Sequence, residues 1–312
     1  MKNHVSVVIA TFSRCDDLKK TLDSLFMQET DGSFSFDVVV VDNNSTDLTK
    51  GIVEKFKARY NDQLNYFFES TQGKSCALNK GITEAKGDII AFTDDDVMID
   101  PKWLSALVRC FEQYPCDGIG GRVLPIYPEN TPRWIKDNPT KIAGAVVIYD
   151  YGDEICIYNP LRYPFLGANF AFRKEVFEEC GMFRTDLVFS FRIALGEDTE
   201  FIERLLSKGK TLYYCGKALV YHPVNLKRIN LRHIARWHMA LGKFDAQREM
   251  KKGKTFIFYF GVPRYIIKGI FLDFLQLVTH CLNRPAFWNA WRSFFRKWGM
   301  IEEYRLSRVK GM

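Results

Sequence analysis

The sequence lacks the short patterns that mark several common classes of protein. It contains neither G-x-x-x-x-G-K-[ST] nor G-x-G-x-x-G, so neither a P-loop ATPase nor a dinucleotide-dependent oxidoreductase is indicated. The eight cysteines form no C-x-x-C pair, which argues against a zinc site and favours a reducing compartment. There is no signal-peptide pattern, internal repeat or low-complexity tract. We therefore expect a globular protein in the cytoplasm.

Acidic residues are scarce in the C-terminal part of the chain. From Leu226 onward there are 18 Lys and Arg against 5 Asp and Glu, a net charge of +13. The preceding residues carry 26 basic and 32 acidic side chains, a net charge of −6. Basic segments favour nucleic acid or anionic lipid. Because no nucleic-acid motif accompanies the charge, we expect an anionic membrane surface as partner of the basic part, and no nucleic acid.

The chain contains a large apolar fraction. Segments with continuous apolar runs alternate with segments whose apolar residues recur at helical spacing. Hydrophobic residues make up 47% of the 312 residues, which is enough for a sizeable core. Continuous apolar runs predict buried strands, and helical spacing between the runs predicts amphipathic helices. The predicted strands span 5–10, 36–42, 64–70 and 88–93, and the predicted helices span 16–28, 43–56, 74–86 and 101–114. This alternation predicts an α/β fold with a Rossmann-like, mainly parallel sheet flanked by helices.

The regular alternation stops at Val123 and resumes at Phe165. Six prolines fall between residues 123 and 164, which predicts a loop-rich insertion. A strand and a short helix are predicted in 165–183, a helix in 196–209 and two short strands in 211–223. We therefore expect a catalytic domain over residues 1–225 and a basic, aromatic helical region over residues 226–312.

One helix pattern in the C-terminal region is strongly apolar. Between residues 262 and 282 the apolar side chains fall on one wide face, but Arg264, Lys268 and Asp273 interrupt the run. The segment is therefore a poor membrane-spanning helix. An interfacial helix, helped by the aromatic and basic residues of 288–298, and an ordinary core helix fit the pattern equally well.

Polar side chains follow three of the predicted strands at their carboxyl ends. Thr11 and Arg14 follow the first strand, Asp42 ends the second, and the run from Asp94 to Asp96 follows the fourth. In an open α/β sheet, ligands bind outside the carboxyl ends of the strands, so we expect these side chains to converge. Alternate residues of an extended segment share a face, so Asp94 and Asp96 are expected to point together.

Two carboxylates on one face suit a divalent cation. Oxygen ligands favour Mg²⁺ or Mn²⁺, ions that keep several waters and bind the phosphates of nucleotides. An isolated acidic triplet is more often a solvated turn, but the position at a strand end, beside a second acidic strand end, favours the cation. Asp95 is expected to point away from Asp94 and Asp96 and to support the donor or the turn.

Two further helix starts carry charged residues. Gly73 and Lys74 precede a helix that contains Asn79, and a helix start with a nearby lysine attracts anions, although such pairs are common in loops. Glu197 and Asp198 open another helix, where one carboxylate can cap the helix while the other serves as a general base. From these residues alone, two capping acids are the more frequent arrangement.

Five segments, taken in order, resemble the family 2 glycosyltransferases of the GT-A fold over residues 4–223. They are VSVVIATFSR, VVVVDNNSTD, QGKSCALNKGITEAKGDIIAFTDDDV, FLGANFAFRKEVFEECGMF and GEDTEFIERLLSKG. The resemblance implies an inverting enzyme that moves a sugar from a UDP- or GDP-sugar to an acceptor hydroxyl, with Asp198 as the base. It also implies a divalent cation on Asp94 and Asp96, with His222 either as a metal or diphosphate contact or as a structural histidine.

The same resemblance divides the remaining residues between donor and acceptor. The expected donor-binding residues are Thr11, Arg14, Asp42, Gly73, Lys74, Asn79, Asp94 and Asp95. The expected acceptor-binding residues are Gly167, Ala168, Asn169, Glu197 and Trp237.

The helix that follows residue 230 departs from the pattern of processive family members. The chain has His233, Arg236 and Trp237 where those members carry Q-x-x-R-W, so transfer of single sugars is favoured over extrusion of a polymer. Trp237 either stacks on an acceptor sugar or is a core aromatic. A saccharide or lipid-linked acceptor is expected, in cell-surface polysaccharide or glycolipid biosynthesis at the inner face of the cell membrane.

Three other functions were weighed against this interpretation. A haloacid-dehalogenase-type phosphatase also places D-x-D after an apolar strand, but it needs Thr or Val where this chain has Met98, and the motif would belong at the first strand. A sugar-phosphate nucleotidyltransferase needs a glycine-rich basic loop after the first strand, and TFSRCDD contains no glycine. A non-enzymatic adaptor that binds a cation or nucleotide is the third alternative.

Overall fold

The computed structural model describes residues 3–159, 165–187, 196–251 and 256–309, so residues 160–164 of the expected insertion lie outside the described part. The chain forms two compact units. The sheet unit contains Met1–Ile126, Ile148–Thr185 and Glu197–Pro223, and the helical unit contains Tyr127–Val147, Asp186–Gly196 and Val224–Met312. Half of the expected insertion thus groups with the C-terminal helices.

One sheet forms the centre of the sheet unit. Its strands are β1 (His4–Thr11), β2 (Ser35–Asp42), β3 (Leu64–Phe68), β4 (Ile89–Thr93), β5 (Met98–Ile99), β6 (Gly118–Ile126), β7 (Ile155–Ile157), β8 (Phe170–Arg173) and β9 (Leu212–Pro223). They run in the order β3-β2-β1-β4-β8-β6-β9-β5, and β7 pairs with β9. Pairing is parallel from β3 to β4 and between β6 and β9, whereas β8 is antiparallel to both of its neighbours. The predicted α/β fold is confirmed, and the sheet is mixed.

The two short strands expected in residues 211–223 form the single strand β9. The register of β6 against β9 shifts between Gly121 and Arg122, where the partner passes from Cys215 to Leu219. This irregularity absorbs the residues between the two apolar runs, so both runs stay paired with the same neighbouring strand.

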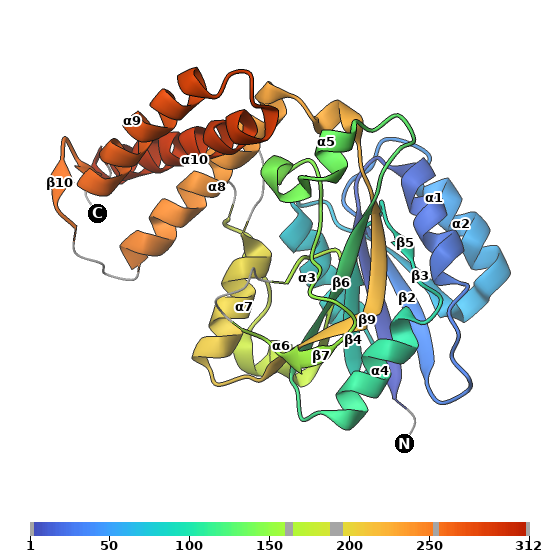
Figure 1. Ribbon diagram of the computed structural model, residues 1–312. Coiled ribbons are helices and arrows are strands. Elements are labelled where there is room, and N and C mark those ends of the chain that lie inside the picture. The colour runs from blue at the N-terminus through green and yellow to red at the C-terminus, as the bar shows by residue number, and fades with distance from the viewer. Residues whose placement is uncertain (1–2, 160–164, 188–195, 252–255, 310–312) are drawn as a thin grey trace. The chain divides into compact units, whose positions relative to one another are not determined.

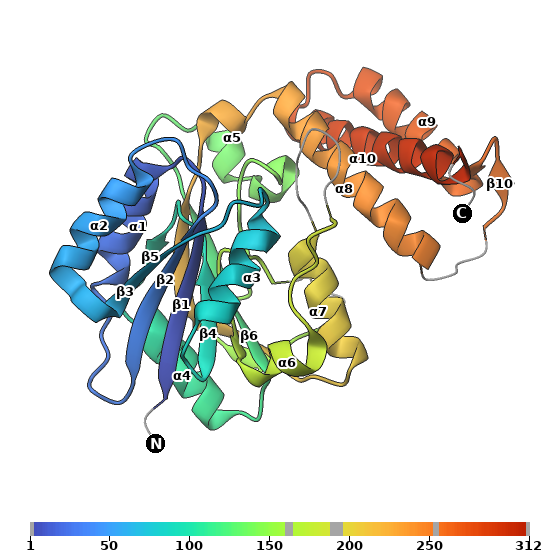
Figure 2. The same cartoon turned by 180° about the vertical axis from the view of Figure 1, so that it is seen from behind.

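Among the described residues, six α-helices belong to the sheet unit. They are α1 (Cys15–Leu25), α2 (Thr49–Tyr60), α3 (Lys74–Glu84), α4 (Trp103–Gln113), α6 (Glu175–Cys180) and α7 (Glu197–Ser207). In α1, Leu18, Leu22 and Leu25 recur at helical spacing, and all three are buried. Figures 1 and 2 show α3 on one face of the sheet and α4 on the other. Coverage of both faces explains why strands such as β2 are buried over nearly their whole length.

Aromatic side chains fill the core beneath the strand ends. Phe92 of β4 and Phe170 of β8 meet edge to face with ring centroids 5.2 Å apart. Phe172 of β8 meets Phe201 of α7 in the same way, with centroids 5.1 Å apart. Such pairs contribute roughly 0.5–1.5 kcal/mol beyond the burial of their area. The cluster fixes α7 against the middle of the sheet.

In its described residues, the helical unit is built on three long helices, one short helix and a short hairpin. Its elements are α5 (Arg133–Lys136), α8 (Leu231–Lys251), β10 (Phe258–Tyr259), β11 (Val262–Pro263), α9 (Arg264–Thr279) and α10 (Arg284–Val309). Glycines let α8 and α10 approach closely, because a Cβ on Gly242 would lie 1.8 Å from the Arg296 carbonyl oxygen. Across the same contact, a Cβ on Gly299 would lie 2.1 Å from the Met239 carbonyl oxygen. Within the described residues, no helix combines the length and apolar character needed to cross a membrane.

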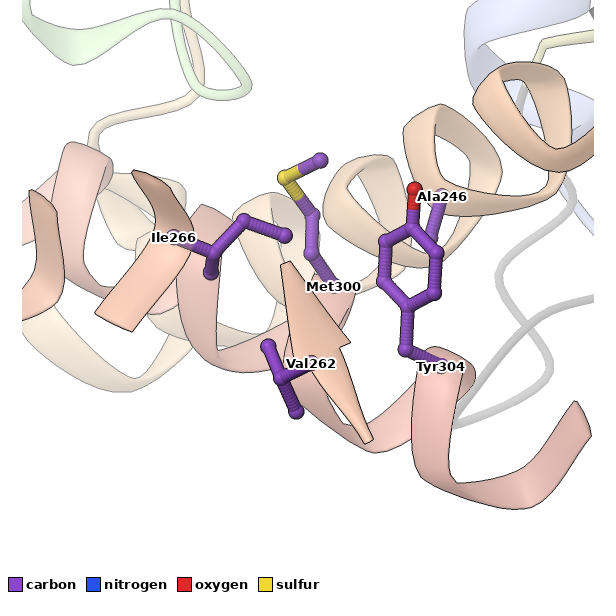
Figure 3. Close-up of a cluster of buried hydrophobic side chains, with 5 residues drawn as sticks. All are labelled: Ala246, Val262, Ile266, Met300 and Tyr304. Atoms are coloured by element: carbon purple, nitrogen blue, oxygen red, sulfur yellow. The ribbon is translucent and has the colours of Figure 1, made fainter. Parts of the chain in front are cut away.

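A small apolar core holds the hairpin and the three long helices of this unit together. Figure 3 shows Val262 of β11 and Ile266 of α9 beside Met300 and Tyr304 of α10, with Ala246 of α8 opposite. All five side chains are buried. The apolar contacts of α9 with the rest of the unit therefore gather around its first turn.

Candidate active site

The polar residues predicted at the strand ends do lie along one edge of the sheet. Thr11 and Asp42 are paired residues at the carboxyl ends of the parallel strands β1 and β2. Asp94 follows Thr93, the last residue of β4, which is parallel to β1. Parallel strands bring their carboxyl ends to the same edge, so these three positions share it.

Asp95 turns towards the first loop. The Thr11 Oγ1 hydroxyl donates to Asp95 Oδ2 at 2.7 Å, and Arg14 Nη1 donates to Asp95 Oδ1 at 2.9 Å and to Asp96 Oδ2 at 3.0 Å. Burial raises the pKa of Asp95 to about 6, while Arg14 and the Thr11 hydroxyl oppose that shift. Arg14 thus offsets part of the repulsion between adjacent carboxylates, and the predicted supporting role of Asp95 remains a prediction.

Asp94, Asp96 and His222 form a cluster that fits a divalent cation. One ligand atom of each residue lies within 4.8 Å of the other two, and no other such group occurs among the residues that the structure describes. His222 Nε2 is 3.5 Å from Asp96 Oδ1, and His222 Nδ1 is 3.1 Å from the Pro223 carbonyl oxygen. With a proton on Nδ1 bonded to that carbonyl, Nε2 offers its lone pair to the cluster. Two carboxylate oxygens and one imidazole nitrogen suit Mn²⁺ or Mg²⁺.

Lys74 places a positive charge beside this cluster. The backbone N–H of Gly73 donates to Asn43 Oδ1 at 2.7 Å, and the φ of +147° at Gly73 favours glycine where the chain enters α3. Lys74 Nζ then donates to Asp94 Oδ1 at 2.7 Å. Burial opposes the charged amine, but Asp94, and after it Asp198, raise the pKa of Lys74 above its ordinary value. The lysine therefore stays charged.

The charge of Lys74 acts in return on Asp94. Burial disfavours ionisation of this carboxyl, but Lys74, with smaller contributions from His222 and Arg14, lowers the pKa of Asp94 below its ordinary value. Asp94 is therefore held as a carboxylate, the form that a metal ligand requires.

Asp198 opens α7 with an unusual environment for a carboxyl. Its Oδ2 accepts the Gly167 N–H at 2.8 Å, whereas its Oδ1 is buried and has no hydrogen-bond partner among the described residues. Burial, together with repulsion from the buried Glu197, raises the pKa of Asp198 to about 8, although Lys74 and the Gly167 N–H oppose the shift. A carboxyl with a pKa near neutral pH and one unused oxygen is suited to accept a proton.

Asp198 and Lys74 both approach the backbone of Gly167 closely. A Cβ at this position would lie 3.0 Å from Asp198 Oδ2 and 3.2 Å from Lys74 Nζ. Any side chain here would push the carboxylate or the ammonium aside, so the close approach explains the glycine.

Two other predicted site residues use their polar side-chain atoms in hydrogen bonds within the protein. Asn79 donates to the Phe183 carbonyl and accepts from the Phe183 N–H. Asn169 accepts from Trp103 Nε1 at 2.8 Å and donates to the carbonyls of Arg122 and Ala218. These two residues hold the chain around the site, and their donor and acceptor roles remain predictions.

The other predicted donor and acceptor residues are placed as follows. Asp42 accepts from the Ser45 N–H and from the Tyr66 hydroxyl, each at 2.8 Å. Ala168 is buried, and its carbonyl accepts from the Thr93 hydroxyl. Trp237 lies on α8 in the helical unit, where its indole occupies the space that a Cβ on Gly144 would fill.

Two residues that support the site stand outside the expected donor-binding and acceptor-binding residues. Asn43 binds the Gly73 N–H with its oxygen and the carbonyls of Glu69 and Thr71 with its amide nitrogen, so it shapes the loop before α3. Tyr66 donates to Asp42 from the neighbouring strand. The only signal for Asn43 was its place directly after a strand end, and Tyr66 gave none.

The fold and the site together define a glycosyltransferase of the GT-A type. A family profile described as glycosyl transferase family 2 matches residues 6–181, more than half of the chain, so the protein belongs to that family. The predicted family and fold are thus confirmed, and the alternative enzyme classes and the adaptor are set aside.

Individual relatives are more distant. The chain is 27% identical over 221 residues to glycosyltransferase AglE of Haloferax volcanii, covering 70% of this chain and 66% of that protein. It is 23% identical over 244 residues to the succinoglycan biosynthesis protein ExoM of Rhizobium meliloti, covering 77% of this chain and 73% of that protein. The chain thus spans just under two thirds of the archaeal relative.

A solved structure extends the likeness to the fold. The mannosyltransferase PcManGT from Pyrobaculum calidifontis, in complex with GDP-Man and Mn²⁺, superposes with a TM-score of 0.64 at 17% sequence identity. The match covers 97% of this chain and 87% of that one. At this identity the likeness concerns the fold.

Proposed function

We propose that this glycosyltransferase is a cation-dependent, inverting enzyme that transfers single sugars from a UDP- or GDP-sugar to an acceptor hydroxyl. The observation that carries the proposal is Asp198, a half-buried carboxyl with a raised pKa and one oxygen without a partner, at the same sheet edge as the cation cluster. The GDP-mannose and Mn²⁺ bound by the structural neighbour support the donor class and the cation.

Asp198 is the proposed base. Its Oδ2 is held by the Gly167 N–H, which leaves Oδ1 to take the proton of the acceptor hydroxyl. The acceptor oxygen then attacks the anomeric carbon from the face opposite the diphosphate. The bond between that carbon and the diphosphate oxygen breaks, and its electron pair leaves with the diphosphate. Attack from the opposite face inverts the configuration at the anomeric carbon.

The leaving diphosphate requires positive charge. A divalent cation bound by Asp94, Asp96 and His222 would stabilise negative charge on the diphosphate. Lys74 and Arg14 add fixed positive charges at the same edge, through their contacts with Asp94 and with Asp95 and Asp96. These side chains are ordered by their partners before any ligand arrives, which lowers the cost of organising them during the reaction.

The acceptor is proposed to be a saccharide, free or lipid-linked, in polysaccharide or glycolipid biosynthesis. The succinoglycan biosynthesis relative supports this setting. The chain does not carry the Q-x-x-R-W segment of processive members, having His233 in place of the glutamine, and this supports transfer of single sugars.

Replacing Asp198 with asparagine tests the proposal. Asp198→Asn removes the proton acceptor but keeps an oxygen for the Gly167 N–H, so transfer should fall by about 10³-fold while donor binding is retained. Transfer is measured with a panel of UDP- and GDP-sugars, and donor binding by calorimetry with Mn²⁺.

The matched control is a second carboxyl on the same helix. Glu200 pairs with Arg204 along α7, and Glu200→Gln makes the same carboxyl-to-amide change away from Gly167. It should keep transfer close to the native rate. Full activity in Asp198→Asn would overturn the assignment of the base.

A further inference from the structure

The helix α9 is oriented with its apolar residues outward. Of its 16 residues only Ile266 and Asp273 are buried. Phe271, Phe274 and Val278 are 62%, 53% and 60% exposed. Amphipathic helices of soluble proteins turn apolar residues inward, whereas α9 leaves several large apolar side chains exposed and buries Asp273. Its large apolar side chains contribute little to the folded unit.

The buried side of α9 explains how the helix is held without those residues. Ile266 enters the apolar cluster with Val262 and Met300 (Figure 3). One to two turns further on, Asp273 Oδ2 accepts from Lys297 Nζ of α10 at 2.7 Å. This ion pair and the apolar contacts of Ile266 and Ile267 fix the rotation of the helix. The outward side is therefore a stable feature of the unit.

The outward apolar residues form one continuous stripe, which we call the apolar face. Its members follow helical spacing and are Phe271, Phe274, Leu275, Val278 and Leu282, all of them exposed. The hairpin that leads into the helix adds Phe258, Tyr259 and Phe260, the last of which is 91% exposed. Contiguous exposed patches of this kind mark binding surfaces.

The charges around the apolar face are of one sign. Between residues 256 and 301 the sole acidic residue is Asp273, and it is buried against Lys297. Arg264, Lys268 and Arg284 are all exposed along α9 and at the start of α10. An apolar stripe bordered by basic side chains complements the headgroups and acyl chains of an anionic bilayer, and it is less suited to a protein partner of mixed charge.

Two of the three tryptophans of α10 that were expected to help at the membrane surface make contacts within the helical unit, whereas Trp298 is 46% exposed. Trp288 stacks on Trp134 with ring centroids 6.2 Å apart. Trp291 Nε1 donates to the Leu231 carbonyl oxygen at 3.0 Å. Both indoles are half-buried by these contacts, and α9 with its hairpin presents the more exposed apolar surface.

We propose that the apolar face of α9, with the tip of the β10–β11 hairpin, inserts into the interfacial layer of an anionic lipid bilayer. The helix lies in the plane of the surface, with its apolar side chains among the acyl chains and its basic side chains at the phosphates. The proposal concerns a surface of the helical unit and does not depend on the transfer reaction.

Two pairs of substitutions, each of which introduces two negative charges, distinguish the apolar face from the rest of α9. Phe271→Glu with Val278→Glu places two carboxylates on the apolar face. Gln276→Glu with Thr279→Glu places the same two charges at exposed positions of the same helix outside it. Both variants carry the same net charge, so a difference between them reports insertion of apolar side chains.

Binding is measured by co-sedimentation with phosphatidylcholine vesicles, with and without phosphatidylglycerol. The native protein should sediment with the anionic vesicles and much less with the neutral ones. The Phe271→Glu/Val278→Glu variant should bind the anionic vesicles about tenfold or more weakly than the Gln276→Glu/Thr279→Glu variant. Circular dichroism and the transfer rate to a water-soluble acceptor check that each variant is folded.

A probe at the end of α9 gives a second, independent measurement. All eight cysteines lie in the described residues, and Cys281 alone among them is exposed. An environment-sensitive fluorophore on Cys281 should shift to shorter wavelength with anionic vesicles. Native protein that stays in the supernatant with anionic vesicles overturns the proposal. So does equal binding by the two variants, or a native dimer in solution that Phe271→Glu/Val278→Glu dissociates while vesicle binding is absent.

Discussion

The two units of this protein differ in how buried charges are balanced by charges of opposite sign. In the helical unit each buried charge has one opposite partner, as in Lys243 with Glu302 and Lys297 with Asp273. At the edge of the sheet unit five carboxylates share two permanently charged cations. The carboxylates are Asp94, Asp95, Asp96, Glu197 and Asp198, and the cations are Arg14 and Lys74. The first arrangement is balanced, and the second carries an excess of negative charge.

The difference indicates what each region is for. Balanced pairs between helices fix how the helices pack, and they leave little electrostatic energy to be used. Burial, and after it the neighbouring carboxylates, raises the pKa of both Asp95 and Asp198. An excess of negative charge also attracts a cation. The contrast therefore indicates a structural role for the ion pairs of the helical unit and is consistent with the proposed chemical role of the carboxylates at the sheet edge.

The largest expected effect comes from removing the proposed cation ligands. Asp94→Asn with Asp96→Asn should lower transfer by about 10³-fold or more, because two of three ligands lose their charge. Calorimetry should show that donor binding no longer depends on Mn²⁺. Asp273→Asn makes the same chemical change in the helical unit and should leave the Mn²⁺ dependence of donor binding unaltered. Equal Mn²⁺ dependence in the native protein and the double variant would remove the cation from the site.

The pH dependence of the reaction should follow Asp198. Asp198 would act as the proposed base in its deprotonated form, and its pKa is raised to about 8, so the active fraction should increase as the pH rises towards 8. Below that value kcat/KM should fall about tenfold for each pH unit. The pH profile of kcat/KM, measured at saturating Mn²⁺, checks this. Between about pH 6 and about pH 8 the rate should therefore change strongly, and a flat profile over that range would contradict the prediction.

In the helical unit, breaking one balanced pair should cost stability without affecting chemistry. Asp273→Asn leaves Lys297 without its buried partner and should lower the free energy of unfolding by about 2 kcal/mol, less than for a pair wholly shielded from water. Adding Lys297→Met should restore part of the loss. Urea unfolding followed by circular dichroism measures both. An unchanged midpoint in Asp273→Asn would show that the pair contributes nothing.

Features of the fold that depend on local sequence could be predicted, whereas features that depend on contacts between remote residues could not. The strands and the edge they share follow from local apolar runs, so Asp42 and the Asp94–Asp96 segment could be placed together in advance. The antiparallel strand β8 between β4 and β6 could not, because its partners are remote in the chain and its own pattern gives no direction. For the same reason the bond between Gly167 and Asp198 was not foreseen.

Periodicity also has a limit in the C-terminal helices. Helical spacing over residues 262–282 predicted one wide apolar side, but spacing does not say how much of that side is buried, and the structure buries Ile266 and exposes Phe271 and Val278. The ion pair between Asp273 and Lys297 settles the rotation of α9, and it joins residues on different helices. Composition suggested that Trp288 and Trp291 lie at the surface, and in the structure both are half-buried by contacts with Trp134 and the Leu231 carbonyl.

The smallest expected effect is a gain of stability at the base itself. The pKa of Asp198 in the folded protein is about 8, against about 4 for an ordinary aspartate. Between these values the folded state keeps a proton that the unfolded chain releases, so stability contributed at this position falls as the pH rises from about 4 to 8. Asp198→Asn carries no charge and escapes that loss. Its thermal midpoint should exceed the native one by about 2 °C or more at pH 8 and by less at pH 5, measured by differential scanning calorimetry. A lower midpoint at pH 8 would mean that the attraction of Lys74 outweighs the burial of the carboxylate, and the site would then resemble the balanced pairs of the helical unit.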